Sequence, residues 1–395
     1  MIRFECVEGS SRFLDPRKGF EEVDVPLEIR RDPLTGKTGR VAHFIHPPSV
    51  TPDFEAMAQI SLSKGCPFCP DKVKSVTPRF RPDVVPEGLI EVGQAVSFPN
   101  LSPYDEHSAV TVMTKEHLVL MDQWTEDVLV DALEAAFLTL DAVRLHHMND
   151  SRQDRKESAS LSNQESQDPG DRQRLGKIQP NRSYDNTRPN RRYSAILWNY
   201  MPPSGGTQIH PHLQILDSPT PSSVQRLEIS EAKAYYEETG RSLWSDYVDT
   251  EVALGERIIA QGSYVTWLSS FMPRGLMGEV TAVFSGPALT LKATNTARES
   301  WPARRTVLTE FAGGLMKLLS FFKAQGIWSL NMALIPEMET GSPFAVPAHA
   351  RIAPRIFLHP VLGSPDMNAL QVLLDESLTF IYPEEFARSV APYFS

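Results

Sequence analysis

The chain has few cysteines and none of the long apolar runs that mark a membrane protein. Cys6, Cys66 and Cys69 are its only cysteines in 395 residues, too few and too unevenly spaced for a disulfide framework. No stretch approaches the roughly 18 uninterrupted apolar residues of a membrane span. The first residues, MIRFECVEGSSRF, lack the charged-then-apolar order of a secretory signal. We therefore expect a cytoplasmic protein with no membrane association.

The chain also lacks an excess of basic residues. Its formal charge is −10, from 39 Lys and Arg against 49 Asp and Glu. Proteins that coat nucleic acids usually show a basic balance or stripe, so we expect no nucleic-acid partner. An anionic small ligand is compatible with this charge where local cations or backbone N–H groups meet it. The hydrophobic content of 41% is enough for the cores of two domains.

One segment, residues 148–193, is nearly devoid of aliphatic side chains. It is rich in Ser, Asn, Gln, Asp and Arg. Such a composition buries too little apolar surface to offset the entropy lost when a chain becomes ordered. We interpret the segment as a disordered, solvated insertion between two folded pieces of one domain, although its mixed charge could also serve a partner.

The patterns around this segment indicate two similar halves. Each half shows alternating strand patterns, then apolar residues at helical spacing, then further strand patterns. The repeat is one of pattern rather than of letters, and a helical stretch over residues 222–259 joins the halves. We predict an α+β fold of two related halves, each an antiparallel sheet with packed helices, divided into domains 1–220 and 221–395. The predicted strands are 95–104, 108–117, 193–201, 210–216, 262–271, 278–286, 327–335 and 351–361, and the predicted helices are 124–147 and 303–326.

The segment NYMPPSGGTQIHPHLQ, from Asn199 to Gln214, carries the strongest chemical signal. On an extended strand His210 and His212 would point to the same face, because side chains alternate with a period of two. The amide of Gln214 follows on that face. A bare HxH pair is more often two unrelated histidines on a solvated strand than a site, so its meaning depends on the rest of the chain.

Cys66-Pro-Phe-Cys69 is a CxxC pair. With two further nitrogen or sulfur ligands, such a pair makes a tetrahedral zinc site, and His117 and His210 are candidates for the other two. A thioredoxin-like redox role would need a βαβ setting, which the neighbouring GCPFCPDKVKSVTPRF does not offer. Two unrelated buried thiols are the remaining alternative.

Four segments, in the same order, resemble the signatures of the galactose-1-phosphate uridylyltransferases, the transferase branch of the histidine-triad superfamily. They are PLEIRRDPLTG, CPFC, the TKEH segment ending in His117, and NYMPPSGGTQIHPHLQ. The likeness continues through SDYVDTEVALGERII and PRGLMGEVTAVF, so it covers most of the chain outside residues 148–193. It implies two histidine-triad-like halves and the transfer of a nucleoside monophosphate between sugar 1-phosphates, with a nucleotide sugar and a sugar 1-phosphate as substrates.

The resemblance implies a double displacement in which His212 attacks the α-phosphorus of the nucleotide sugar. A covalent nucleotidyl-histidine forms and splits one difficult transfer into two easier ones. Gln214 would hydrogen-bond the phosphoryl oxygens, and because an amide is no general acid, transfer is favoured over hydrolysis. The resemblance places the other substrate contacts at Asn100 for the ribose or base, Asn199 and the turn Ser204-Gly205-Gly206-Thr207 for the phosphates, and Glu376 for the sugar hydroxyls.

The resemblance also implies one structural zinc ion. Cys66, Cys69, His117 and His210 would form its shell, and four protein ligands make the closed type of site that holds structure rather than activating water. Some family members have a second metal, bound by a glutamate and three histidines. Glu228 fits the glutamate, but NMALI and RIAPRIF hold no histidine, so we expect the second metal to be absent.

The sequence departs from the family pattern where phosphate-binding cations are expected. The family has an arginine-bearing segment shortly after its first strand, whereas residues 42–50 read AHFIHPPSV. Those cations are therefore missing or come from elsewhere in the chain. For Glu376, an exposed helix acid is as good an interpretation as a sugar contact.

Two other functions fit the same motifs. A phosphorylase, with inorganic phosphate as acceptor, would use the same nucleophile and glutamine. A catalytically silent nucleotide-binding or scaffold homologue would keep the fold and the zinc but lack the nucleotide site. A homodimer is a further option from the resemblance, since family members often pair so that one subunit completes the sugar site of the other.

Overall fold

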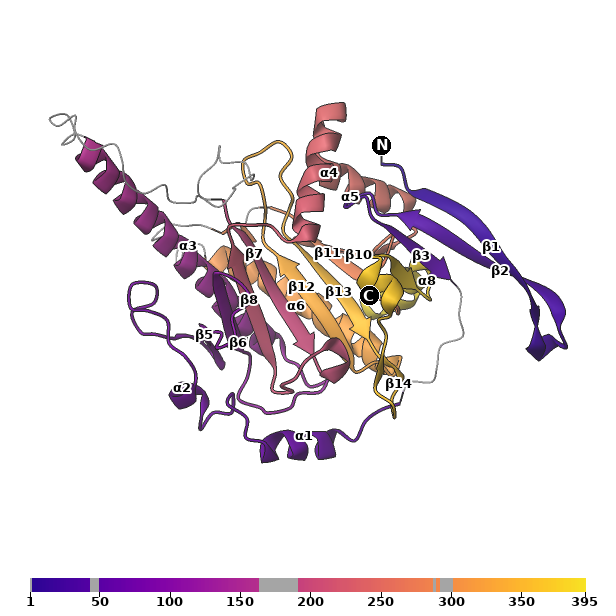
Figure 1. Ribbon diagram of the computed structural model, residues 1–395, viewed down its shortest axis with the longest axis horizontal. Helices are drawn as coiled ribbons and strands as arrows, with labels where there is room; N and C mark the ends of the chain where they lie inside the picture. Colours follow the sequence, from indigo (N-terminus) through magenta and orange to yellow (C-terminus); the bar gives the residue numbers. More distant parts are fainter. Residues whose placement is uncertain (1, 43–49, 163–190, 287–288, 292–300) are drawn as a thin grey trace, which may run out of the picture.

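The computed structural model describes residues 2–42, 50–162, 191–286, 289–291 and 301–395. At its centre lies one ten-stranded sheet in which every neighbouring pair is antiparallel (Figure 1). In sheet order the strands are β4 (Ile90–Val92), β5 (Ala95–Pro99), β6 (His107–Val112), β8 (His212–Ser218), β7 (Tyr193–Tyr200), β12 (Ser329–Ile335), β13 (His349–Arg355), β11 (Val280–Phe284), β10 (Val265–Ser269) and β9 (Ile258–Gln261).

The order of elements along the chain is the same on the two sides of the sheet's midline. In the first half, three strands are followed by helix α3 (Glu126–Ser162) and then by β7 and β8. In the second half, three strands are followed by helix α6 (Trp301–Ala324) and then by β12 and β13. The halves meet where β7 pairs with β12. The predicted α+β fold of two related halves is therefore confirmed, with the strands of both halves joined in one sheet.

One face of the sheet is covered by α3 and α6. Their apolar side chains, such as Phe137 of α3 and Phe311 of α6, are fully buried in the main core. On β7, Ile196 and Trp198 point into this core, so Leu197 and Asn199 face the opposite side because strand residues alternate. Burial of each large apolar side chain stabilises the fold by about 1.5–3 kcal/mol. The helices thus leave the second face of the sheet free for other groups.

In the second half, this other face is also covered, by α4 (Ser223–Thr239) and α5 (Leu243–Leu254). Leu243 and Trp244 of α5 form a second core with Leu268 of β10 and Val283 of β11. Along the chain, α4 and α5 follow β8, the last strand of the first half, and precede β9, but they pack on the strands of the second half. The open face of the molecule therefore lies mainly over the first half and the midline.

The linker predicted as one helical stretch over 222–259 is two helices and the start of a strand. Gly240 ends α4 with a φ of 69°, and Gly255 ends α5 with a φ of 70°. Glycine favours this left-handed conformation because it has no Cβ. The prediction of one continuous helix was wrong because apolar residues keep a helical spacing on both sides of each glycine. The last residues of the stretch, from Ile258, belong to the edge strand β9.

A smaller four-stranded sheet lies beside the main one. Its order is β1 (Glu5–Asp15), β2 (Glu21–Arg31), β3 (Thr38–Ala42) and β16 (Ser377–Thr379). β1 and β2 extend away from the body as a two-stranded arm (Figure 1). The remaining elements are η1 (Pro16–Lys18), α1 (Phe54–Ser63), α2 (Val73–Val76), η3 (Pro202–Ser204), β14 (Phe357–His359), β15 (Ser364–Pro365), α7 (Ala369–Leu373), α8 (Pro383–Val390) and η5 (Ala391–Tyr393).

Helix α3 continues through Ser162, so it includes the first part of the segment 148–193 that the composition marks as an insertion. Residues 163–190 lie outside the described part of the chain. So do residues 43–49 of the AHFIHPPSV segment, where the family arginines are missing. Among the described helices, none combines the length and the apolar character that a membrane span requires.

Candidate functional site

His212 and Gln214 lie on the face of β8 that α3 and α6 leave uncovered. Leu213 and Ile215, which alternate with them, are buried in the main core. The amide of Asn199, on the neighbouring strand β7, donates from Nδ2 to Oε1 of Gln214 at 3.4 Å. The fold thus brings three of the expected site residues together on one open face.

The imidazole of His212 is held in one orientation by the backbone. Its Nδ1 lies 2.9 Å from the carbonyl oxygen of His210, so Nδ1 carries the proton and Nε2 keeps a free lone pair. Burial lowers the pKa of His212, and the contact with the His210 carbonyl acts in the opposite direction. The ring of Phe68 packs beside it, with ring centroids 5.2 Å apart. A neutral imidazole with a free Nε2 is the form that acts as a nucleophile.

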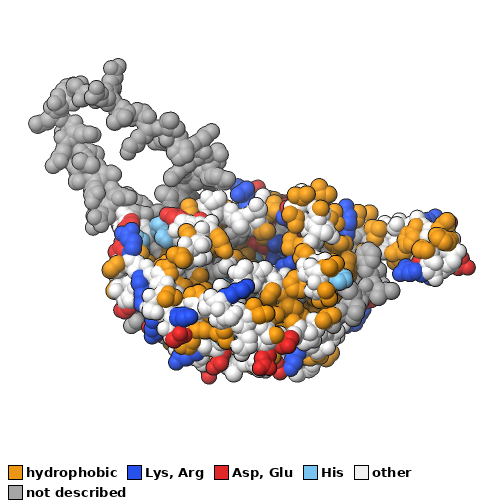
Figure 2. Space-filling model, turned by 60° about the horizontal axis from the view of Figure 1, so that its bottom comes forward, with side chains coloured by type: hydrophobic (Ala, Val, Ile, Leu, Met, Phe, Trp, Pro, Cys, Tyr) orange, Lys and Arg blue, Asp and Glu red, His pale blue; other side chains and the backbone are white. Residues whose placement is uncertain are grey.

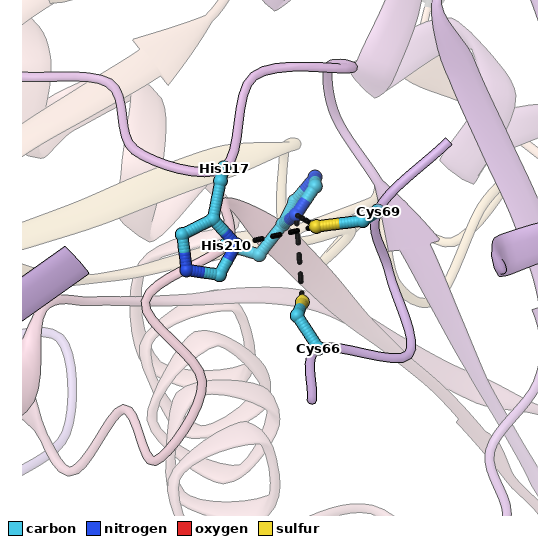
Figure 3. Close-up of side chains that lie close together, drawn as sticks. All are labelled: Cys66, Cys69, His117 and His210. Atoms are coloured by element: carbon cyan, nitrogen blue, oxygen red, sulfur yellow. Dashed lines mark hydrogen bonds between the residues drawn. The ribbon is translucent and has the colours of Figure 1, made fainter. Parts of the chain in front are cut away.

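Cys66, Cys69, His117 and His210 converge on one point (Figure 3). Nδ1 of His210 lies 3.6 Å from Sγ of Cys66 and 3.8 Å from Sγ of Cys69, and Nδ1 of His117 lies 3.4 Å from Sγ of Cys69. Cys66 and His210 are buried, whereas Cys69 and His117 are partly exposed. The structure therefore confirms that these four side chains form a cluster that could bind a metal ion.

The geometry of this cluster fits a tetrahedral zinc ion. With Zn–S bonds of about 2.3 Å and Zn–N bonds of about 2.0–2.1 Å, sulfur and nitrogen ligands lie about 3.6 Å apart, close to the observed separations. His210 donates from Nε2 to the carbonyl oxygen of Thr114 at 2.9 Å, which aims Nδ1 at the thiols. Burial lowers the pKa of His210 to about 4, so its imidazole is neutral, as metal binding requires.

An apolar wall lies next to His212. Val112 and Val110 of β6 stand opposite His212 and Gln214 in the strand register, and they form a small core with Phe98 of β5. Phe68 of the CPFC segment packs against this core. Phe98, Val110 and Val112 are nearly fully buried, so this wall is a packed support beside the nucleophile.

Asn100 lies just beyond the end of β5, at the far end of this wall. Its Oδ1 accepts a hydrogen bond from the backbone N–H of Ser102 at 3.0 Å, and its Nδ2 lies 3.4 Å from Oγ of Ser108. Along β6, Ser108 is four residues from Val112, the partner of His212. Asn100 is therefore about 13 Å along the strand from the nucleophile, far enough for a nucleoside to fit between them.

The turn Ser204-Gly205-Gly206-Thr207 connects β7 to β8. Gly205 has a φ of 86°, and a Cβ on Gly206 would lie 2.8 Å from the carbonyl oxygen of Asn199. Both positions therefore require glycine. Asn331 of β12 holds this turn in place. The Nδ2 of Asn331 donates to Oδ1 of Asn199 at 2.7 Å and to the carbonyl oxygen of Ser204 at 3.0 Å. The sequence motif alone does not identify Asn331.

A groove of ≈ 770 Å³ runs along the open face between β7, β12 and α4. Figure 2 shows a hollow in this face with basic and acidic side chains inside it. Asn199 and Asn331 line the groove, as do Arg274 and Arg351. Among the described residues, Nη2 of Arg274 is buried and has no hydrogen-bond partner. Arg274 is thus a cation available to a phosphate, although nothing in the spacing of PRGLMGEV marks it.

Glu376 lies in an adjoining groove that shares Arg274 and Asn331 with the first. Its carboxylate forms an ion pair with Arg40 and accepts a hydrogen bond from Oγ1 of Thr38 at 3.0 Å. Its side chain is only partly exposed. The structure thus places Glu376 near the groove, but in a paired state with the smaller sheet.

His349 stands two residues before Arg351, the first residue of RIAPRIF, and the sequence pattern did not identify it as a potential metal ligand. Its Nε2 lies 3.4 Å from Oε1 of Glu228. Arg351 lies against the same carboxylate at 3.1 Å and donates to Glu279 at 3.0 Å. Burial acts to raise the pKa of Glu228, but His349 and Arg351 lower it to about 2. A guanidinium therefore already balances these buried carboxylates.

Comparisons with known proteins agree with this geometry at the level of the fold. No protein-family model matches the chain. An uncharacterized protein of Archaeoglobus fulgidus is 25% identical over 377 residues, 93% of each chain. ADP-glucose phosphorylase from Arabidopsis thaliana, solved with bound ADP-glucose, matches 92% of this chain and 98% of its own, at 13% identity and a TM-score of 0.59. A uridylyltransferase matches over the same shares at 17% identity and a TM-score of 0.53. The chain therefore has the fold of the uridylyltransferases and of ADP-glucose phosphorylase, as the resemblance in its sequence predicts.

Proposed function

We propose that the chain is a nucleotidyltransferase that moves a nucleoside monophosphate from a nucleotide sugar to a sugar 1-phosphate through a covalent intermediate on His212. The observation that carries this proposal is the orientation of His212. Its Nδ1 is bound to the His210 carbonyl, and its Nε2 is left free beside Gln214 on the open face. The apolar wall formed by Phe98, Val110 and their neighbours lies next to it.

In the first step, Nε2 of His212 attacks the α-phosphorus and forms a P–N bond. The bond between this phosphorus and the bridging oxygen breaks, and sugar 1-phosphate leaves with the electron pair. The His210 carbonyl stabilises the positive charge on the imidazole through the Nδ1 proton. In the second step, a phosphate oxygen of the acceptor attacks the same phosphorus, and the P–N bond breaks to restore the neutral imidazole.

The amides of Gln214 and Asn199 would hold the non-bridging oxygens during both steps. Neither amide gives up a proton, so the site favours a phosphate acceptor that arrives as an anion. Arg274, with its unpartnered Nη2 in the same groove, would meet the phosphate charge that the missing arginines meet in the family. Glu376 and Asn100 would contact the sugar and the ribose or base.

The cluster of Cys66, Cys69, His117 and His210 would hold one zinc ion. Because four protein ligands close the shell, the ion would stabilise structure and would not activate water. Its chemical effect is to fix His210, whose carbonyl orients His212. We expect about one zinc ion per chain in this cluster, and a chain with both Cys66→Ala and Cys69→Ala to lose it and become less stable, because the binding energy of a structural site is folding energy.

Mass spectrometry after incubation with a panel of nucleotide sugars, with no acceptor, tests the proposal. We expect an acid-labile, base-stable adduct whose mass identifies the nucleotide. His212→Ala should form none, and the exposed His359→Ala serves as the matched control. An adduct on His212→Ala would contradict the mechanism. A zinc-loaded chain that binds no nucleotide by calorimetry would identify a silent homologue.

A phosphorylase is the second candidate, and the fold comparison favours naming it. The match to ADP-glucose phosphorylase has a TM-score of 0.59, against 0.53 for the uridylyltransferase. Both reactions begin with the same attack of His212 on the nucleotide sugar. They differ in the acceptor that takes the nucleoside monophosphate in the second step. The labelled enzyme should therefore be offered glucose 1-phosphate, galactose 1-phosphate and inorganic phosphate in turn. Discharge by inorganic phosphate alone would replace transfer with phosphorolysis.

A further inference from the structure

A second group of side chains that could bind a metal ion lies away from His212, at the opposite end of β6. It consists of Glu106, His107 and His147. His107 begins β6 and His147 lies on α3, and their Nε2 atoms face each other. Nε2 of His147 lies 3.8 Å from Oε1 of Glu106. In the described part of the chain, this group and the Cys66 cluster are the two places where three or more potential ligand atoms lie within 4.8 Å of one another.

We propose that Glu106, His107 and His147 bind a divalent ion of the zinc type. Two imidazole nitrogens and one carboxylate oxygen form a ligand set that zinc accepts in proteins. Unlike the Cys66 cluster, this set has three protein ligands, so a fourth position stays open to water or to an anionic group.

The surroundings orient these ligands. Arg192 donates from Nη1 to Oε2 of Glu106 at 3.1 Å and from Nη2 to the carbonyl oxygen of Asp217 at 3.0 Å. This contact holds one carboxylate oxygen and leaves the other toward His147, as partners behind a metal ligand commonly do. The positive charges of Arg192 and Arg144 are balanced by Asp217 and Glu106, so an incoming cation meets no net positive charge.

Both imidazoles are in the form that binds metals. Burial, with the nearby Arg192, lowers the pKa of His107 to about 4, and the same causes lower the pKa of His147. Neutral imidazoles keep a lone pair for an ion. Without an ion, one ring would donate a hydrogen bond to the other. The zinc titration distinguishes metal binding from this hydrogen bond.

The position of the site indicates what the ion would do. It would tie β6 to α3 where α3 leaves the sheet and projects from the body (Figure 1). His107 is five residues from Val112, the partner of His212, or about 17 Å along the strand. The ion would therefore not touch the reacting phosphorus. Glu106 also lines the groove that contains Asn199, so the group lies beside that groove.

Zinc binding without any nucleotide tests this inference independently of the proposed transfer. The full chain, dialysed to remove loosely held metal, should retain zinc at the Cys66 cluster and bind about one further zinc ion in calorimetric titration with zinc chloride. His107→Ala and His147→Ala should each weaken the binding of this further zinc ion at least tenfold. This is on the order of the loss seen when a residue that orients a metal ligand is removed. His146→Ala, at the adjacent position on α3, is the matched control and should bind as the unchanged chain does.

Cobalt gives a second readout that also reports on folding. Thiolate-to-cobalt absorption comes from the Cys66 cluster and should be the same in His147→Ala and in the unchanged chain, which shows that the variant is folded. The second equivalent of cobalt should add absorption without a thiolate band, and only in chains that keep His107 and His147. No uptake beyond the Cys66 cluster, or equal uptake by His147→Ala, would overturn the inference and leave a His–His hydrogen bond.

Discussion

His212 in the first half and His349 in the second occupy corresponding places in the fold. His212 begins β8 opposite Val112 of β6, and His349 begins β13 opposite Val283 of β11. Each ring also makes the same contact with the residue two positions earlier. Nδ1 of His212 lies 2.9 Å from the His210 carbonyl oxygen, and Nδ1 of His349 lies 3.0 Å from that of Pro347. The backbone thus builds the same imidazole orientation twice.

What covers the two imidazoles differs. His349 is fully buried, packed against Trp244 of α5 with ring centroids 4.6 Å apart, and next to Glu228 of α4. His212 is only partly buried, and among the described residues it has no carboxylate partner. Two residues further along each strand stand Gln214 and Arg351. The same strand geometry therefore presents an accessible nucleophile in one half and a buried ionic network in the other, because α4 and α5 lie over only one of them.

The largest expected difference between the halves is in transfer. His212→Ala should abolish adduct formation, a loss on the order of 10³-fold or more, as for removal of other nucleophiles. His349→Ala should still form the adduct, because the ring is buried and separated from the groove by its partners. Quenched-flow measurement of adduct formation compares the two. Equal losses in both variants, with folding intact, would mean that the second imidazole takes part in the chemistry.

The next comparison is between Arg351 and Gln214. Arg351→Met should lower the free energy of unfolding by about 3–5 kcal/mol, because Glu228 and Glu279 would stay buried without the guanidinium that they share. Gln214→Met should change it by no more than about 0.5 kcal/mol, as for a partly exposed side chain, while slowing transfer by roughly 10- to 1,000-fold. Chemical denaturation and transfer assays on both variants measure this. A stable Arg351→Met chain would show that the guanidinium is not needed to balance the carboxylates.

A pH profile should separate the two halves further. The pKa of Glu228 is lowered to about 2 from an ordinary value of 4.5, so its ionised form stabilises the folded state above pH 4.5. This contribution is lost as the pH falls toward 2. The difference in stability between the unchanged chain and Glu228→Gln should therefore be largest near neutral pH and shrink in acid. Denaturation at several pH values measures it, and a difference that grows in acid would contradict the assignment.

The smallest effect is expected where the halves differ most in sequence. In the second half, residues 325–328 alone connect α6 to β12, whereas the first half carries the polar segment 148–193 at the same place. Replacing residues 150–190 by a short glycine and serine linker should change the free energy of unfolding by no more than about 0.5 kcal/mol. Thermal and denaturant unfolding test this, with zinc content as the control. A loss above about 2 kcal/mol would show that the segment packs on the body.

Much of this molecule is determined by short-range sequence. The alternation in Tyr193–Tyr200 and the helical spacing before and after it set which residues enter the main core, because a strand and a helix have fixed periods. The alternation of side chains along a strand determined that His212 and Gln214 share one face. The metal cluster was predicted through the family resemblance, since Cys66 and Cys69 lie 144 and 141 positions from His210. The core pattern and the strand face are local features, and the sequence was sufficient for them.

Other features were decided only by the tertiary structure. Asn331 and Arg274 reach the groove from the second half because β7 pairs with β12, and no spacing along the chain encodes that pairing. His349 and Arg351 meet Glu228 because α4 folds back over β13, and His147 meets His107 because α3 crosses the end of β6. These contacts join residues 40 to more than 100 positions apart. Only the packing of whole helices and strands, driven by apolar burial, brings them within reach of one another.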